Sequence, residues 1–125
     1  NEILKTDITN VDEKAVEKKI LEMLAQYPRI RVIFVTNSRV VSVAKCLEKH
    51  FIDHVHVIGY DLLESGMEYL KNGVIDFLIC QKPQEQGYRG IMALYHHLIL
   101  NLKVSDRYYM PIDIVTRENC AYYKN

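Results

Sequence analysis

The sequence predicts an α/β fold in which a mostly parallel sheet carries helices on both faces. Short apolar runs, typical of buried strands, alternate along the chain with stretches whose apolar residues recur every three or four positions. Strands that alternate with helices are joined by right-handed crossovers, so most of them run parallel. The 125 residues are 49% hydrophobic and 26% charged, which suits one globular domain with its own core.

Extended structure is expected in five segments. A short extended run begins the chain, and each later strand follows a helical stretch. The second segment reads Arg-Val-Ile-Phe-Val, and its unbroken apolar character is typical of a strand that is buried on both faces. The expected segments are residues 3–8, 31–35, 54–58, 74–80 and 109–115.

The first two helices have signals at their ends. Asn10 and Glu13 form a loose capping box before the first helix, and Pro28 stops it. Ser38 is expected to cap the second helix. The residues expected to face inward are Val16, Ile20, Met23, Leu24 and Tyr27 in the first helix, and Val40, Val43, Ala44, Leu47 and Phe51 in the second.

Two further helices complete the alternation. The third carries Leu63, Met67 and Leu70 on one face, and Asn72-Gly73 supplies its left-handed end. A longer helix is expected from about residue 84 to residue 102. The tail after residue 118 is expected to be loosely held.

Charge and cysteine content exclude several classes of protein. Lys plus Arg and Asp plus Glu are both 16, so no basic face large enough to hold a nucleic acid is implied. Cys46, Cys80 and Cys120 are odd in number and far apart, which favours buried reduced thiols over disulfides or a zinc site. No apolar run is long enough to span a membrane, and the first residue, Asn1, suggests an internal start.

Enzyme and metal functions have little support in the sequence. A receiver domain would explain Asp61 and Lys82-Pro83, but Asp7 stands alone where an acidic pair should bind magnesium. The sequence has no glycine-rich phosphate-binding motif. None of its histidines lies near a loop with a motif for a catalytic nucleophile. His54 and His56 share a strand face but lack a cysteine or carboxylate partner. We therefore expect no catalytic residue, no metal and no cofactor.

Polar side chains follow three of the apolar strands. Asn37, Asp61 and Gln81 each come where a strand should end, and ligands of parallel α/β sheets bind at that edge. Amides and carboxylates can each hold two neighbouring hydroxyl groups, so the set suits a neutral sugar. The alternative is that Asn37 and Asp61 only cap the helices that follow. Tyr60 is a weaker candidate contact, since it neighbours Asp61 but should point to the opposite side.

Four segments in order carry a family resemblance. They are Phe-Val-Thr-Asn-Ser-Arg-Val-Val (34–41), His-Val-Ile-Gly-Tyr-Asp (56–61), Cys-Gln-Lys-Pro-Gln-Glu-Gln-Gly-Tyr (80–88) and Pro-Ile-Asp-Ile-Val-Thr-Arg-Glu-Asn (111–119). Together they resemble the effector-binding domain of LacI/GalR-family regulators and the related periplasmic sugar-binding proteins. The resemblance extends over nearly the whole chain. One departure is Ser38, where the family often has Asp.

The resemblance implies the periplasmic-binding-protein type I fold, in which a sugar binds between two subdomains. It implies that Asn37, Asp61 and Gln81 reach into that cleft. It further implies that this chain is the carboxyl-terminal part of such a domain. Residues 1–81 would form most of the carboxyl-terminal subdomain, residues 82–103 a helix of the other subdomain, and residues 108–119 the last strand and return.

On this resemblance we expect the sensing domain of a LacI-type transcription regulator. It would bind a carbohydrate effector, form a homodimer in the cytoplasm, and control operator DNA only through a domain outside this chain. Membrane contact is not expected. The alternative is an extracytoplasmic sugar receptor that serves a transporter or a sensor kinase. The sequence names neither the sugar nor the direction of its regulatory effect.

Overall fold

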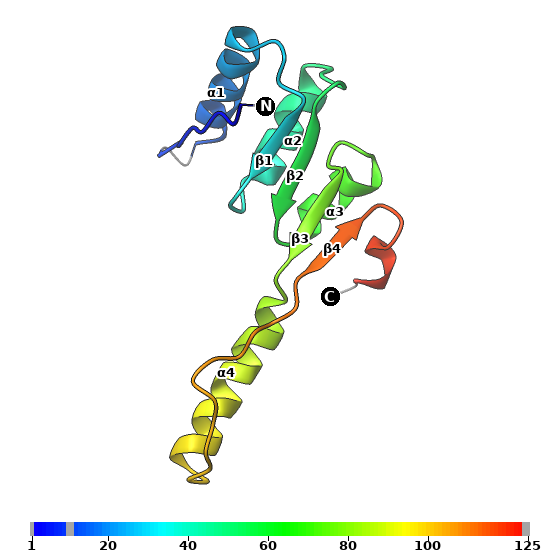
Figure 1. The fold of residues 1–125 in the computed structure, drawn as a ribbon. Coiled ribbons are helices and arrows are strands. Elements are labelled where there is room, and N and C mark those ends of the chain that lie inside the picture. The colour runs from blue at the N-terminus through cyan, green and yellow to red at the C-terminus, as the bar shows by residue number, and fades with distance from the viewer. Residues whose placement is uncertain (1, 10–11, 124–125) are drawn as a thin grey trace.

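The computed structural model describes residues 2–9 and 12–123. Helices and strands alternate along most of the chain (Figure 1). The elements are α1 (Glu13–Gln26), β1 (Val32–Val35), α2 (Val40–Lys49), β2 (His56–Tyr60), α3 (Glu64–Lys71), β3 (Phe77–Cys80), α4 (Pro83–Leu98), β4 (Asp113–Thr116) and the short 3-10 helix η1 (Cys120–Tyr122).

The four strands form one sheet in the order β1-β2-β3-β4. The first three run parallel, with Val35 opposite Gly59 and Gly59 opposite Leu78. The last strand is antiparallel, and Cys80 lies opposite Asp113 at the end of that ladder. The predicted α/β class with a mostly parallel sheet is confirmed.

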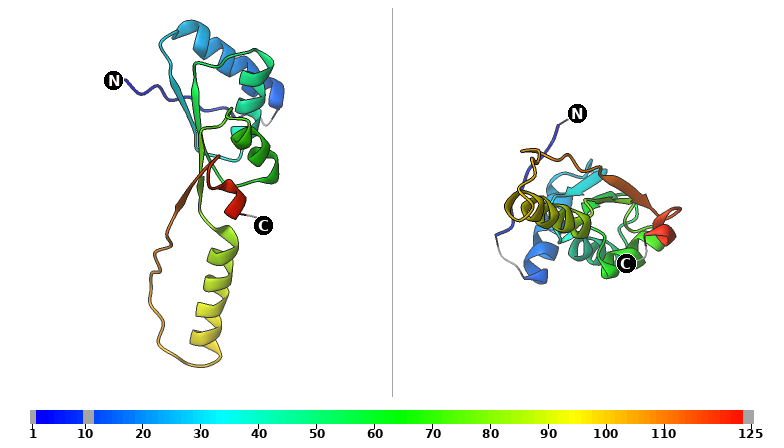
Figure 2. Two further views of the ribbon diagram at one scale, coloured as in Figure 1. Left: turned by 90° about the vertical axis from the view of Figure 1, so that its right-hand side faces the viewer. Right: turned by 90° about the horizontal axis from the view of Figure 1, so that it is seen from below.

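Helical cover within these residues lies on one face of the sheet, and not on both faces as the sequence predicted. Helices α1, α2 and α3 pack side by side on that face (Figure 2), and α2 contacts both of its neighbours. Alternate strand residues therefore point into the core, among them Val57, Leu78 and Val115, each with no exposed surface. On the opposite face the side chains of Val32 and Phe34 are half-exposed, so the expectation that residues 31–35 are buried on both faces is wrong for this chain.

A close approach between β2 and α2 depends on one glycine. A Cβ at Gly59 would overlap the Val40 side chain, since it would lie only 2.7 Å from the Val40 Cβ. Val40 is itself 1% exposed, so it has no free space to move into. Gly59 thus lets the first turn of α2 sit directly against the sheet.

Helix boundaries differ from the sequence-based expectations at three places. Asp12 caps α1 by accepting a hydrogen bond from the Lys14 amide at 3.3 Å, while Asn10 lies outside the described residues. Helix α2 begins at Val40 without a side-chain cap, so Ser38 does not cap it. The α2 helix ends before Phe51, which has a φ of 53° and a side chain that is 93% exposed rather than turned inward.

Strands are shorter than predicted because their first residues serve as connections. The sheet begins at His56 in β2, at Phe77 in β3 and at Asp113 in β4. Residues 2–9 lie outside the ladder.

Helix α4 and the following stretch project from the sheet as an arm, residues 83–112 (Figures 1 and 2). None of the α4 residues is buried. The helix ends at Leu98, short of the predicted Leu102, because Asn101 takes a left-handed φ of 51° and the Leu102 amide turns back to the His96 carbonyl at 2.9 Å. Exposed large apolar residues of the arm are Tyr88, Ile91, Leu94, Tyr95, Leu98, Ile99, Leu100, Leu102, Tyr108, Tyr109 and Ile112.

The tail after residue 118 is held in place, contrary to expectation, as far as residue 123. The Asn119 side chain accepts from the Thr116 amide at 2.7 Å and donates to the Ile114 carbonyl at 3.0 Å. Cys120 is 2% exposed and belongs to the core. These bonds dock η1 against the end of β4.

Candidate functional site

The carboxyl ends of the three parallel strands lie at the edge of the sheet from which the arm projects (Figure 1). Asn37 follows β1 after one intervening residue, Asp61 directly follows β2, and Gln81 directly follows β3. Because these strands are neighbours, the three predicted site residues share one edge of the sheet. Their arrangement along that edge is the one the sequence predicted.

Asp61 has the most constrained backbone at this edge. Its φ is 67°, a left-handed value that a side-chain-bearing residue seldom adopts outside turns and functional sites. Its amide donates to the Ile79 carbonyl at 3.0 Å, which ties the residue to β3. The half-buried carboxylate has no hydrogen-bond partner within residues 2–9 and 12–123. Asp61 therefore presents a charged acceptor that the described chain does not use.

Gln81 is held through its backbone. The Gln86 side-chain amide donates to the Gln81 carbonyl at 2.7 Å, and the next residue, Lys82, has a left-handed φ of 53°. The side-chain carboxamide of Gln81 is half-buried and makes no hydrogen bond to the part of the chain that the structure describes. It offers both a donor and an acceptor.

Asn37 and Tyr60 both have a contact within the chain. The Asn37 side-chain oxygen accepts from the Arg39 amide at 3.0 Å, the local turn contact that was the alternative to ligand binding. This leaves its amide NH₂ as the group available to a ligand. Tyr60 packs on Phe34 with ring centroids 5.6 Å apart, on the half-exposed face of the sheet. Tyr60 is thus a surface-packing residue beside the edge.

A network that sequence reasoning missed stands beside Gln81. The Lys82 ammonium lies 3.0 Å from a carboxylate oxygen of Asp113, and the Tyr123 hydroxyl donates to the same oxygen at 3.2 Å. The hydrogen bond to Asp113 raises the pKa of Lys82 above its usual 10.5. Burial, and then the bond to Asp113, raises the pKa of Tyr123. The pairing depends on how β4 returns to β3, which the sequence pattern does not reveal.

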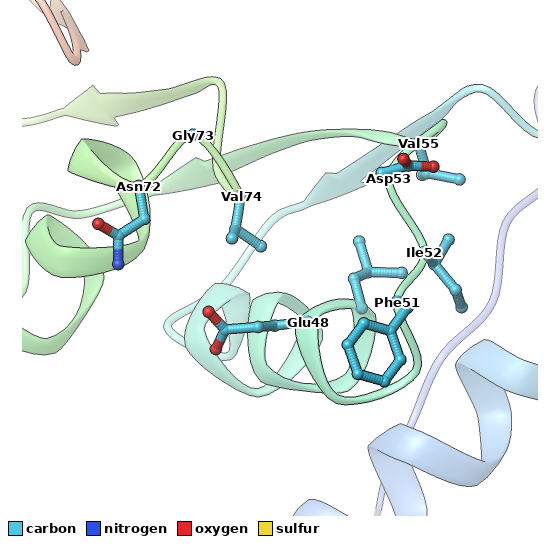
Figure 3. Close-up of a pocket in the computed structure, with 9 residues that line it drawn as sticks. Glu48, Phe51, Ile52, Asp53, Val55, Asn72, Gly73 and Val74 are labelled. Atoms are coloured by element: carbon cyan, nitrogen blue, oxygen red, sulfur yellow. The ribbon is translucent and has the colours of Figure 1, made fainter.

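Two shallow hollows lie away from the three polar side chains. One, of about 310 Å³, is at the opposite, amino edge of the sheet between the end of α2 and the turn after α3 (Figure 3). Its lining mixes apolar Phe51, Ile52 and Val74 with Glu48, Asp53 and Asn72. The other, of about 440 Å³, runs along the arm between Arg89 and Tyr108. Neither encloses the site that the strand ends define.

Within residues 2–9 and 12–123, no three His, Cys, Asp or Glu side chains converge as a metal site would require. Among the same residues, no helix is long and apolar enough to cross a bilayer. The three cysteines are buried and unpaired, as expected, and burial raises the pKa of Cys46.

Comparison with known proteins identifies relatives of this chain. The family model described as periplasmic binding protein domain matches residues 2–101. The xylose/arabinose-binding protein XylF of Sulfolobus acidocaldarius is 38% identical over 58 residues, which are 46% of this chain and 13% of that protein.

Solved structures show the same fold. A protein from Bacteroides fragilis assigned to the LacI transcriptional regulators is 35% identical with a TM-score of 0.81, over 87% of this chain and 38% of its own length. An ABC transporter solute-binding protein from Agrobacterium vitis, bound to α-D-tagatopyranose, is 22% identical with a TM-score of 0.83, over 94% of this chain and 40% of its own length. This chain thus spans about two fifths of these structures. Since the family model matches most of it, the chain belongs to the periplasmic binding protein domain family.

Proposed function

We propose that this chain is part of a sugar-binding domain whose ligand is held at the carboxyl edge of the parallel sheet. The observation that carries the proposal is the position of Asp61 and Gln81, two half-buried polar side chains without partners in the described chain, after adjacent strands. Asp61 would accept hydrogen bonds from two neighbouring sugar hydroxyls. Gln81 would accept one and donate one, and the Asn37 NH₂ group would donate another. Tyr60 is a further candidate contact.

A neutral polyol suits this edge better than an anion. Asp61 supplies a negative charge, and the nearby Lys82 is already paired with Asp113. A phosphate or carboxylate ligand would meet an uncompensated carboxylate, whereas a hydroxyl can donate to it. Binding of this kind needs no covalent chemistry, so the protein is proposed to be a binding protein rather than an enzyme.

The exposed apolar surface of the arm supports a two-part architecture. An apolar surface of this extent is normally covered in a stable protein. Residues 1–81 are therefore proposed to form most of one subdomain, and residues 82–103 to pack in a second subdomain outside this chain. Residues 108–119 would return to supply the last strand. The sugar would sit between the two parts.

For the whole protein, a sugar-responsive transcription regulator is the first candidate. Its support is the 35% identity with the Bacteroides fragilis protein assigned to the LacI regulators, over most of this chain. Sugar binding would close the cleft and change the geometry of a cytoplasmic homodimer. That change would alter the affinity of a separate domain for operator DNA. Allosteric coupling of this kind is typically about 1–3 kcal/mol.

A sugar receptor for a transporter or sensor is the second candidate. The observation that favours it is the 38% identity with XylF, which is limited to 58 residues. The same carboxyl-edge site would serve delivery of the sugar instead of DNA regulation.

A thermal-shift screen tests the binding function. The intact protein would be heated with single monosaccharides and with sugar phosphates, and a neutral sugar is expected to raise the unfolding temperature more than its phosphate. A larger shift with the phosphates would contradict the proposed chemistry. Gel-shift titration of the DNA upstream of the protein's gene, with and without that sugar, then separates the two candidates. Only a regulator would change its affinity for DNA when the sugar is added.

A further inference from the structure

Two stretches of backbone connect the sheet to the arm, and one ion pair lies where they leave and re-enter the sheet. The outgoing connection is residues 81–83, and the return reaches the sheet at Asp113. Asp113 lies opposite Cys80 at the last pair of the β3–β4 ladder. The Lys82 ammonium and the Asp113 carboxylate meet at 3.0 Å, so the ion pair ties the outgoing connection to the first residue of β4, where the return from the arm enters the sheet.

A third residue brings the end of the described chain into this contact. The Tyr123 hydroxyl donates to the Asp113 oxygen that also accepts from Lys82, at 3.2 Å. The Lys82 and Asp113 side chains are 31% and 26% exposed, less than those of the Lys45–Glu13 pair at 57% and 51%. Partial exclusion of water strengthens such a contact relative to a fully solvated one. We name Lys82, Asp113 and Tyr123 the hinge clamp.

The hinge clamp acts on backbone torsions that direct the arm. Lys82 is the residue before α4 and has φ and ψ of 53° and 58°, a left-handed conformation that a lysine adopts only when its surroundings hold it. Its carbonyl accepts from the Gln86 amide at 3.0 Å, and the Gln86 side chain holds the Gln81 carbonyl at 2.7 Å. The direction of α4 and the placement of Gln81 thus depend on the same two residues, Lys82 and Gln86.

We propose that the hinge clamp positions Gln81 and favours, among the angles that sheet and arm can adopt, the one at which the cleft closes on a ligand. This proposal rests on the proposed sugar site. The ligand would lie between the sheet and a subdomain that includes the arm. It therefore binds only to protein molecules in which sheet and arm have the angle that the site requires. Its apparent Kd rises as that fraction falls. Lys82, Asp113 and Tyr123 are positioning residues that need not touch the sugar.

The test uses three variants of the intact protein with minimal changes of shape. Lys82→Met keeps the stem and removes the charge, Asp113→Asn keeps the shape, and Tyr123→Phe removes only the hydroxyl. The titrated ligand is the sugar that most raises the unfolding temperature of the wild type. Calorimetry is expected to give a Kd about threefold to tenfold higher for Lys82→Met and Asp113→Asn, with a smaller change for Tyr123→Phe. The double variant Lys82→Met/Asp113→Asn should bind no more weakly than the weaker single variant, because both remove the same contact.

Lys45→Met is the matched control, since Lys45 pairs with Glu13 at 2.9 Å between α2 and α1, away from the hinge. It should leave the Kd unchanged. A Kd for Lys82→Met and Asp113→Asn equal to that of the wild type, or an equal loss in Lys45→Met, overturns the proposal.

Hydrogen exchange gives a readout that needs no sugar. The Gln86 amide bonds to the Lys82 carbonyl, so it should exchange several-fold faster in Lys82→Met and Asp113→Asn than in the wild type, and at the wild-type rate in Lys45→Met. If the wild type binds no sugar, the proposed function fails while faster exchange still supports the hinge clamp. Unchanged exchange at Gln86 in both variants refutes the hinge clamp whatever the sugar result.

Discussion

The backbone amide of Asp61 donates to the carbonyl of Ile79 at 3.0 Å, and this bond holds the aspartate at a φ of 67°. A left-handed conformation costs an ordinary residue roughly 1–2 kcal/mol. Aspartate tolerates it better than most residues, because its short polar side chain suits tight turns. The bond to β3 thus keeps a carboxylate at the sheet edge in a conformation that would not otherwise persist.

Asp61→Gly separates the backbone role of this residue from its chemical role. Glycine adopts the left-handed conformation freely, and its greater unfolded-state entropy offsets that gain, so stability should stay within about 1 kcal/mol of the wild type. Sugar affinity should fall by about tenfold to a hundredfold, because a charged hydrogen bond to a hydroxyl is lost. Urea unfolding and calorimetric titration of the same preparation measure both. Large destabilisation together with normal affinity would reverse the assigned roles.

Gly59→Ala should destabilise the fold through one local clash. The new methyl group would overlap the buried Val40 side chain, and overpacking of this kind costs about 1–3 kcal/mol. Gly87→Ala on α4 is the control, since nothing lies within 4 Å of a Cβ there and alanine favours a helix by up to about 1 kcal/mol. Urea denaturation of both variants checks the pair. Equal stability of Gly59→Ala and the wild type would disprove the close β2–α2 contact.

Glu17 should make stability depend on acid pH. Its carboxylate on α1 accepts from Lys49 at 2.9 Å, the last residue of α2, and from His50 at 2.8 Å, the residue after it. These bonds hold the pKa of Glu17 below the usual 4.5. Its contribution is therefore complete above about pH 4.5 and is lost as the pH falls through the lower folded-state pKa. The free energy of unfolding of Glu17→Gln should lie below that of the wild type at about pH 6, and the gap should narrow progressively as the pH falls below about 4.5.

A matched variant controls this measurement. Glu22 pairs with Lys18 at 3.9 Å within α1 alone, so Glu22→Gln should show a much smaller gap at every pH. A gap for Glu17→Gln that stays constant from neutral to acid pH would contradict the role of this carboxylate.

Residues 1–125 expressed alone should associate in solution. The exposed apolar face of α4 is proposed to pack in a second subdomain, and without that cover it should bind another copy. Light scattering is expected to show a mass that grows with concentration. The variant Ile91→Gln/Leu94→Gln/Leu98→Gln should scatter as a monomer. A monodisperse monomer of the unaltered chain would count against the division of the domain at residue 82.

The strand ends were predictable from sequence because parallel strands carry their functional groups at one edge. Asp61 and Gln81 each follow an apolar run, and that pattern alone placed them together. The left-handed backbone of Asp61 was not foreseeable, since it depends on a bond to Ile79 in another strand. Whether Asn37 served a turn or a ligand was open in the sequence, and only the contact with Arg39 shows the turn role.

Other features depended on tertiary structure that periodicity does not carry. Phe51 continues the apolar spacing of α2, yet the helix ends first and leaves the ring in solvent. The pairing of Lys82 with Asp113 follows from the antiparallel return of β4, which joins residues far apart in the chain. The sequence does not show that helices cover only one face of the sheet, because the apolar run of β1 would suit a sheet with or without a second layer of helices.

Calorimetric titration of the intact protein with the sugar that most raises its unfolding temperature tests the proposed site most directly. Asp61→Asn keeps the shape and tolerates the left-handed backbone but removes the charge, whereas Asp53→Asn makes the same change at the opposite edge of the sheet. We predict that Asp61→Asn binds at least about tenfold more weakly than the wild type and that Asp53→Asn binds equally well. Equal affinity of Asp61→Asn and the wild type would contradict a sugar site at this edge.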